Sequence, residues 1–203
     1  MRRRVGVLIS GSGSNLQALL NAAADAAFPA EIALVISNRP GAGGLARAEA
    51  AGVPALTIDH RAHEGRAPFE DALHAALTEH GVETVCLAGF MRVLTEGFVR
   101  RWAGRMLNIH PSLLPSFRGL HVHARALAAG VRVSGCTVHL VTPDLDDGPI
   151  LGQAAVPVLP NDTEDALAAR VLAAEHRLYP AALRAFLTGE AAGADEAATV
   201  LSV

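Results

Sequence analysis

Two polar residues, two positions apart, close an apolar run near the middle of the chain. The run begins at Met106, and Asn108 and His110 lie at its end, just before Pro111. Side chains of an extended strand repeat every two residues, so the amide and the imidazole project to the same side. Such a pair can stabilise a developing oxyanion and transfer a proton. By itself an Asn-x-His is more often a satisfied polar pair than a catalytic one.

Three carboxylates lie within four residues later in the chain. Asp144, Asp146 and Asp147 precede a Gly-Pro pair and stand between two apolar runs. As a surface turn this composition is ordinary, because Asp, Gly and Pro all favour turns. As part of a site, one carboxylate turns inward to orient and charge an imidazole. The spacing does not decide which of the three would do so.

A glycine-rich turn follows the first apolar run and opens the first helical segment. It spans Gly11, Ser12, Gly13, Ser14 and Asn15. The free amides and the dipole of a helix N-terminus favour an anion there. A plain strand-to-helix turn is the alternative, but we favour phosphate binding because strand, turn and helix stand in the right order. A dinucleotide-binding fingerprint would need a third glycine, which is missing.

Glu175 lies on the apolar stripe of the last long helical segment. The stripe consists of Leu167, Val171, Ala174 and Leu178. A carboxylate on a core-facing stripe is costly unless it is paired or bound to a ligand. A stripe-edge Glu that reaches water is the ordinary alternative, and the residues alone favour it slightly.

The elements that must position these residues alternate along the first 110 residues. The apolar runs lack polar alternation, which is typical of parallel strands covered on both faces, and they lie at residues 5–9, 32–37, 55–58, 84–88 and 106–109. Helical patterns separate them at residues 15–27, 44–51, 68–80 and 96–102. This alternation predicts an α/β protein with an open, doubly wound, mainly parallel sheet. We expect Asn108 and His110 at the carboxyl end of a central strand, beside the loop that holds Asp146.

The pattern changes after residue 130. Two strand-like segments, 133–141 and 148–158, are joined by only a loop, which predicts antiparallel strands added to the sheet. A helix is expected from Thr163 to about residue 187, with Asn161 or Asp162 as its cap and Pro180 kinking or dividing it. No linker or repeat interrupts the chain, so we predict one domain over residues 1–188 and a loosely ordered tail at 189–203.

The composition indicates a folded protein without general affinity for polyanions. The 203 residues are 51% hydrophobic and 18% charged, with a formal net charge of −3. This balance argues against disorder and against attraction to nucleic acid or an anionic membrane. No apolar stretch approaches membrane-spanning length. The basic start is followed by too short an apolar run for a signal peptide, so we expect a cytoplasmic protein.

Two residue types narrow the chemistry further. All 17 basic residues are arginine. The missing lysine excludes Schiff-base catalysis, attachment of pyridoxal phosphate and a phosphate-loop lysine. Cys86 and Cys136 stand in apolar runs and are expected to be buried thiols of a reducing compartment. Their spacing does not suit a metal site, and no metal is expected.

Four blocks of the sequence, taken together, resemble the folate-dependent glycinamide ribonucleotide formyltransferase family. They lie at residues 9–17, 87–92, 108–115 and 145–149, and the resemblance extends from about residue 5 to residue 186. It implies a formyltransferase-type, Rossmann-like fold. It also implies direct transfer of a formyl group from 10-formyltetrahydrofolate, a co-substrate, to the amine of glycinamide ribonucleotide in de novo purine biosynthesis.

The resemblance also implies roles for particular residues. The catalytic trio is Asn108, His110 and Asp146. The residues expected to bind the acceptor are Gly13, Ser14, Asn15, Leu172, Ala173, Ala174 and Glu175. The residues expected to bind the folate are Arg66, Met91, Arg92, Val93, Leu94, Asn108, Thr142, Pro143, Asp144, Leu145 and Asp146.

The chemistry of formyl transfer suits that trio. The attacking amine must be neutral, and the formyl carbon becomes a tetrahedral centre with an anionic oxygen. Asn108 donates to that oxygen, while His110, protonated and steadied by Asp146, stabilises it and passes a proton to the leaving folate nitrogen. No metal or covalent enzyme intermediate is required. The expected partners are two small molecules, with no nucleic acid and no membrane, and a homodimer is left open.

Two residues depart from the pattern of the family. Arg118 stands where many relatives have Pro, and Asp147 stands where a small residue is common. Both leave the trio unchanged. Asp147 adds a negative charge close to His110.

Other functions remain to be weighed against formyl transfer. A formyltetrahydrofolate deformylase would use the same trio with water as the nucleophile, but those relatives carry a preceding domain, whereas the first strand here begins at Val5. They also differ at residues 111–113. Transfer RNA formyltransferases carry a further C-terminal domain and need a basic surface. The missing third glycine argues against a dehydrogenase, and a cluster of Asn108, His110 and Asp146 would argue against a non-catalytic nucleotide-binding module.

Overall fold

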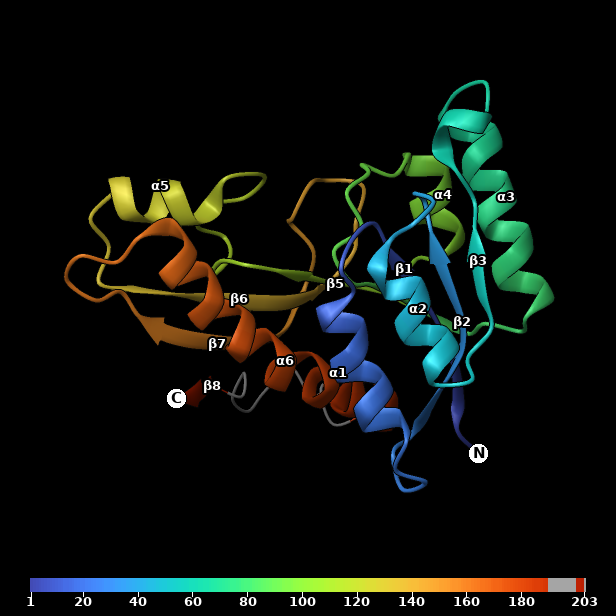
Figure 1. Cartoon of the computed structure of the whole chain (residues 1–203), viewed down its shortest axis with the longest axis horizontal. Coiled ribbons are helices and arrows are strands. Elements are labelled where there is room, and N and C mark those ends of the chain that lie inside the picture. The colour runs from blue at the N-terminus through green and yellow to red at the C-terminus, as the bar shows by residue number, and fades with distance from the viewer. Residues whose placement is uncertain (190–199, 203) are drawn as a thin grey trace. The chain divides into compact units, whose positions relative to one another are not determined.

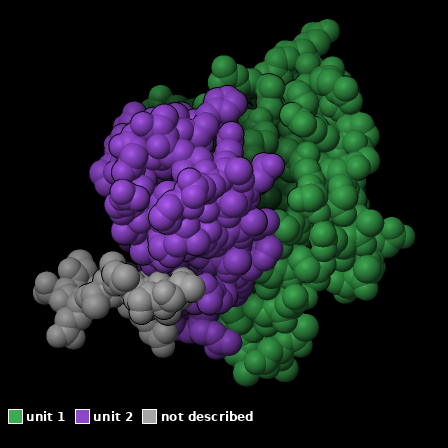
Figure 2. Space-filling model, turned by 60° about the vertical axis from the view of Figure 1, so that its left-hand side comes forward, with its two compact units in different colours: residues 1–108 green, residues 109–203 purple. Residues whose placement is uncertain are grey.

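The chain divides into two compact units, residues 1–108 and residues 109–203 (Figure 2). The computed structural model describes residues 1–189 and 200–202. Most of the predicted tail, residues 190–199 and 203, lies outside the described residues. The single domain expected over residues 1–188 stays a prediction.

Five parallel strands form the sheet of the first unit. Their order is β3-β2-β1-β4-β5, and each hydrogen-bonds to its neighbours in parallel. The strands are β1 (Arg3–Ile9), β2 (Ala30–Ser37), β3 (Ala55–Thr57), β4 (Thr84–Leu87) and β5 (Met106–His110), whose last two residues belong to the second unit. No residue of β2 or β4 is exposed, which explains why these runs lack polar alternation.

Helices connect the strands of this unit (Figure 1). They are α1 (Ser14–Ala23), α2 (Gly43–Ala50), the 3-10 helix η1 (His60–Ala62), α3 (Arg66–Glu79) and α4 (Glu96–Arg101). α1 packs on α2, and α3 packs on α4. The chain reverses its direction along the sheet after β3, and crossovers between parallel strands are right-handed, so the two pairs of helices cover opposite faces. This is the predicted doubly wound arrangement.

The second unit combines antiparallel strands with a long helix. Its elements are α5 (Val122–Ala128), β6 (Val133–Leu140), β7 (Ile150–Pro157), α6 (Glu164–Thr188) and β8 (Val200–Ser202). β6 and β7 pair antiparallel, as predicted, and β8 pairs parallel to β7. α6 packs on both β6 and β7, and α5 packs on α6. Within the described residues, no helix is both long enough and apolar enough to cross a membrane.

Helix α6 has a different cap from the one predicted, and it is not divided at Pro180. Thr163, rather than Asn161 or Asp162, caps it by accepting a hydrogen bond from the amide of Ala166 at 3.2 Å. Pro180 does not divide the helix, which is continuous over its 25 residues. A proline inside a helix removes one hydrogen bond, but neighbouring Tyr179 is fully buried, so packing against the strands outweighs that loss.

Helix α5 was absent from the sequence prediction. It has only seven residues, and no side chain caps its start, where His121 has a φ of 55°. A helix this short forms through tertiary packing and leaves little periodic signal. Val122 and Ala126 are its buried residues.

Both cysteines are buried free thiols, as predicted. Burial, together with the negative charge of Glu175, raises the pKa of the Cys136 thiol to about 12. The thiolate is the reactive form of cysteine. Cys136 is therefore inert at neutral pH for two reasons, burial and protonation.

This predicts a specific labelling pattern. At pH 8 the folded protein should leave Cys136 unmodified by an aromatic disulfide reagent, because both access and the thiolate are lacking. In concentrated urea both thiols should react within minutes. Absorbance of the released thiol measures the reaction, and fast labelling of Cys136 in the folded protein would contradict the pKa shift.

Candidate active site

His110 is the last residue of β5 and is almost completely buried. It is 6% exposed, whereas Asn108, two residues earlier, is partly exposed. Because the two residues share one strand, their side chains project to the same face, as expected from their spacing. The carboxyl ends of parallel strands are where open α/β sheets bind ligands.

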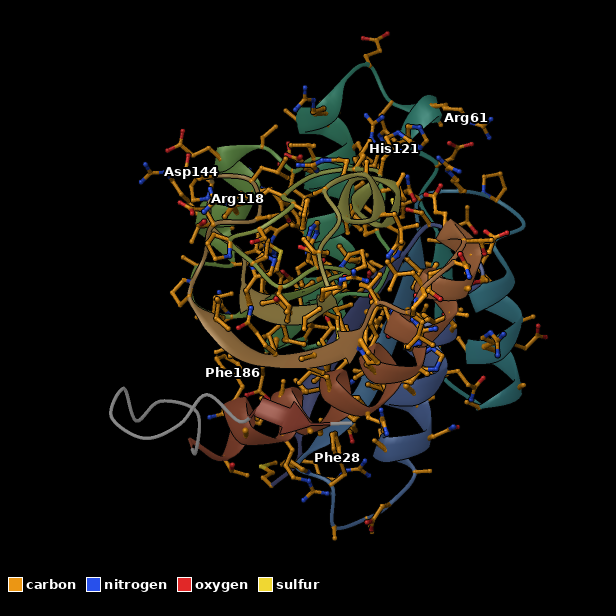
Figure 3. The ribbon with its side chains drawn as sticks, turned by 90° about the vertical axis from the view of Figure 1, so that its left-hand side faces the viewer. Phe28, Arg61, Arg118, His121, Asp144 and Phe186 are labelled. Atoms are coloured by element: carbon orange, nitrogen blue, oxygen red, sulfur yellow. The ribbon has the colours of Figure 1, made fainter. Side chains whose placement is uncertain are left out.

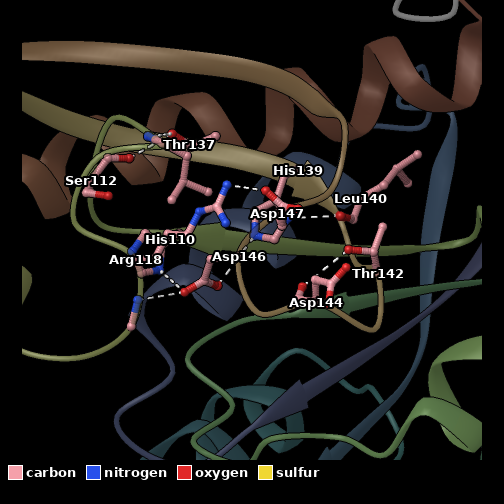
Figure 4. A network of polar contacts seen from close by, with 12 residues as sticks. His110, Ser112, Arg118, Thr137, His139, Leu140, Thr142, Asp144, Asp146 and Asp147 are labelled. Atoms are coloured by element: carbon pink, nitrogen blue, oxygen red, sulfur yellow. Dashed lines mark hydrogen bonds and ion pairs between the residues drawn. The ribbon is translucent and has the colours of Figure 1, made fainter.

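Asp146 is the carboxylate that faces His110. Its Oδ2 lies 3.4 Å from His110 Nδ1, and the two side chains are 9% and 7% exposed (Figure 4). The backbone amide of Gly119 donates a hydrogen bond of 2.9 Å to the same oxygen. Asp144 and Asp147 are exposed, and Figure 3 shows Asp144 at the surface of the second unit. The structure thus distinguishes one carboxylate from the three that the sequence left open.

The other ring nitrogen of His110 is also engaged. Nε2 lies 3.1 Å from the backbone carbonyl oxygen of Phe117. A carbonyl oxygen accepts hydrogen bonds, so Nε2 carries a hydrogen in this arrangement. A carboxylate therefore faces Nδ1 and a carbonyl oxygen faces Nε2, so both ring nitrogens lie against hydrogen-bond acceptors.

A buried polar network anchors the turn that follows His110. Thr137 Oγ1 donates to the carbonyl oxygen of Ser112 at 2.7 Å and accepts from the amide of Leu114 at 3.0 Å. Gln153 Nε2 donates to the carbonyl oxygen of Leu114 at 2.9 Å. Ser112 Oγ donates to the carbonyl oxygen of Ser116 at 2.6 Å. The turn is therefore fixed to β6 and β7, and the Phe117 carbonyl is positioned with it.

His139 was not singled out from the sequence. It lies on β6, is 2% exposed, and its Nε2 is 3.9 Å from Asp146 Oδ1. Its Nδ1 donates to the carbonyl oxygen of Leu140 at 2.9 Å. Burial lowers its pKa, although the Leu140 hydrogen bond and the Asp146 charge act in the opposite direction. The sequence offered one clue to His139, namely that this polar residue stands in an apolar strand two residues after Thr137.

The glycine-rich turn belongs to the first unit. Gly13 precedes α1 with a φ of 72°, and no side chain caps the helix. A Cβ at Gly13 would lie 2.5 Å from Gly44 Cα, so this glycine also permits the close approach of α2. Arg47 Nε donates to the carbonyl oxygen of Ser12 at 2.8 Å, which brings a guanidinium to the turn.

The residues assigned to the acceptor and the folate fall on both units. In the second unit Leu172–Glu175 are part of α6, and Glu175 is 6% exposed. In the first unit Arg66 begins α3 and is exposed. Met91 and Val93 are exposed large apolar residues of the first unit, and Leu145 is one of the second. Among the described residues no group of three His, Cys, Asp or Glu is placed to hold a metal.

Comparisons with known proteins define the family. A model of the formyl transferase family matches residues 3–183. Phosphoribosylglycinamide formyltransferase of Escherichia coli is 44% identical over 90% of this chain and 86% of its own length. The crystal structure of glycinamide ribonucleotide transformylase 1 from Symbiobacterium toebii has a TM-score of 0.90 and 52% identity, covering 93% of this chain and 89% of that one. The Brucella melitensis phosphoribosylglycinamide formyltransferase structure has a TM-score of 0.89, 55% identity and coverages of 93% and 97%.

The chain therefore belongs to the formyl transferase family, and within it to the phosphoribosylglycinamide formyltransferases. This confirms the predicted family, the enzyme class and the α/β fold. Other relatives are much longer. The chain is 52% identical to the trifunctional purine biosynthetic protein adenosine-3 of Gallus gallus but spans 18% of that protein's length.

The lowered pKa of His139 predicts a pH-dependent stability. Because folding favours its neutral imidazole, this contribution is fully present above the usual value of 6.5 and is lost as the pH falls below it. The free energy of unfolding of the His139→Gln variant should therefore decline less steeply than that of the wild type between pH 6.5 and 5. Urea titrations at each pH measure the difference. Parallel pH profiles would contradict the burial of a neutral His139.

Proposed function

We propose that this protein transfers a formyl group from 10-formyltetrahydrofolate to the amine of glycinamide ribonucleotide. Family membership supports formyl transfer, and the names of the relatives support the acceptor. The single observation in the structure that carries the proposal is the buried His110–Asp146 pair at the end of the strand that also bears Asn108.

In the proposed reaction the neutral acceptor amine attacks the formyl carbon. The carbonyl oxygen becomes an anion, and Asn108 stabilises it by donating a hydrogen bond. The proton that the amine loses passes by way of His110 to the folate nitrogen as the carbon–nitrogen bond to the folate breaks. Asp146 orients the imidazole and stabilises its positive charge while it carries that proton. Each bond formed is matched by one broken, so no further reactant is needed.

We assign the acceptor phosphate to the start of α1. The amides of Gly13, Ser14 and Asn15 lie at a helix N-terminus that no side chain caps, which suits an anion. Arg47 adds a positive charge at the same turn. The remaining assignments, with Leu172–Glu175 for the acceptor and the exposed Met91, Val93 and Leu145 for the folate, follow the family resemblance.

Hydrolysis of 10-formyltetrahydrofolate is the alternative that uses the same trio. The relatives that match this chain over most of both lengths carry the name of the transferase. The anion site proposed at the start of α1 would also serve a phosphorylated acceptor, which hydrolysis by water does not require. These observations favour transfer.

The first test measures the need for an acceptor. The purified protein should consume 10-formyltetrahydrofolate rapidly when glycinamide ribonucleotide is present and negligibly when it is absent. Folate absorbance follows the donor, and chromatography follows the formylated product. Release of formate without the acceptor would identify a hydrolase and refute the proposal.

The second test concerns the coupling of His110 and Asp146. Asp146→Asn keeps the shape of the side chain but removes its charge, so kcat should fall by about 10²–10³-fold. His110→Ala should cost at least as much, and the double variant little more, because residues that act as one unit are not additive. Asp165→Asn, at an exposed carboxylate in the first turn of α6, serves as the control. Multiplicative losses in the double variant would show that the two residues act independently.

A further inference from the structure

We infer that the ion pair between Arg118 and Asp147 is a positioning clasp that holds Asp146 against His110. The inference rests on the proposed function and names two further residues for it. Both residues depart from the sequence pattern of the family, and each alone would add a charge beside the centre. In the structure they are each other's partner, since the Arg118 guanidinium donates to the Asp147 carboxylate (Figure 4).

The clasp lies directly beside the atoms that contact the imidazole. Arg118 stands between Phe117, whose carbonyl oxygen is 3.1 Å from His110 Nε2, and Gly119, whose amide donates to Asp146. Asp147 is the neighbour of Asp146 on the opposite loop. The ion pair thus joins the segment that contacts one ring nitrogen to the loop that contacts the other.

Strained backbone occurs at both ends of the clasp. Phe117 has a φ of 55° and Asp146 a φ of 50°, in the left-handed region that residues with a Cβ rarely adopt. Such conformations persist where the surroundings over-determine them. Each strained residue is followed directly by one member of the ion pair, so the ion pair helps to hold both residues in their strained conformations.

The base of the loop between β6 and β7 is fixed by contacts within the loop, whereas its exposed tip requires contacts with another segment to hold its position. The amide of Leu140 donates to the carbonyl oxygen of Pro149 at 2.9 Å, and a Cβ at Gly148 would collide with the Leu140 carbonyl oxygen. At the tip Leu145 is 56% exposed. The Gly119–Asp146 hydrogen bond and the clasp connect this tip to the facing segment.

The other side of the clasp has its own anchor in α5. Arg125 Nη1 donates to the carbonyl oxygen of Arg118 at 2.6 Å, and its guanidinium lies 5.6 Å from the centre of the Phe117 ring. Residues 117 and 118 are therefore held by contacts that do not involve Asp147. The anchored side positions the exposed loop, rather than the reverse.

Because the ion pair is exposed, its effect on catalysis can be distinguished from an effect on the stability of the fold. Both side chains are 42% exposed, and a pair this accessible to water contributes little to the stability of the fold. Catalysis is more sensitive, because a misplacement of about 1 Å can cost about 10²-fold in rate. Loss of the clasp should therefore lower turnover while the protein remains folded.

The experiment compares Arg118→Gln, Asp147→Asn, the double variant and Asp147→Glu. Arg3→Gln is the matched control, because Arg3 forms a similarly exposed pair with Glu83, at 2.6 Å, among residues without an assigned role. Hydrogen exchange of the Gly119 amide reports the contact with Asp146 without any reaction. Formylation of glycinamide ribonucleotide gives kcat and the KM of the acceptor, and thermal unfolding monitors the fold.

Both single variants should exchange the Gly119 amide several-fold faster and lose about tenfold in kcat, with an unchanged acceptor KM and an unchanged melting temperature. The double variant should match the singles, Asp147→Glu should recover most of the activity, and the control should behave as the wild type. Unchanged Gly119 exchange in both singles, or multiplicative losses of kcat, would overturn the clasp. Failure of the wild type to formylate the acceptor would instead refute the proposed function, and the exchange data would still decide the clasp.

Discussion

The buried contact between an imidazole and a carboxylate is the constraint on which the second unit depends. A charged side chain removed from water is stable only when partners replace the lost hydration. Gly119 supplies an amide to Asp146, and Phe117 supplies a carbonyl to His110. Both partners are backbone groups of one short segment, residues 117–119. The path of that segment is therefore constrained by the His110–Asp146 pair.

That segment in turn explains the polar residues inside β6 and β7. Thr137 is fully buried, and it would destabilise the core without partners. Its hydroxyl bonds to the Ser112 carbonyl and the Leu114 amide, on either side of Leu113, and Gln153 extends the same network from β7. Without the Thr137 hydroxyl, the turn would lose both of these hydrogen bonds to β6. The antiparallel strands therefore serve as a frame for the site as well as a core.

Much of the fold could be predicted because strands that are buried on both faces of a sheet give a simple pattern in the sequence. The strands of the first unit are continuous apolar runs, and the ends of most of them fall within two residues of their prediction. The strand end at His110 was recognisable for the same reason. The spacing of the three carboxylates did not single out Asp146, because its contact with His110 depends on a left-handed backbone at Asp146 and on a hydrogen bond from the amide of Gly119, 27 residues earlier. His139 was missed because a histidine in a buried strand looks the same whether or not a carboxylate faces it.

The glycine-rich turn shows why a residue type can fit two explanations at once. The amides that suit a phosphate are exposed only if the turn is tight, and a tight turn requires the positive φ of Gly13. The same tightness brings α2 so close that a Cβ at Gly13 would meet Gly44, and one at Gly44 would meet Ile9. A larger residue at position 13 would therefore disturb helix packing and anion binding together. The phosphate assignment depends on the backbone amides and on Arg47, whereas Gly13 alone is explained by packing.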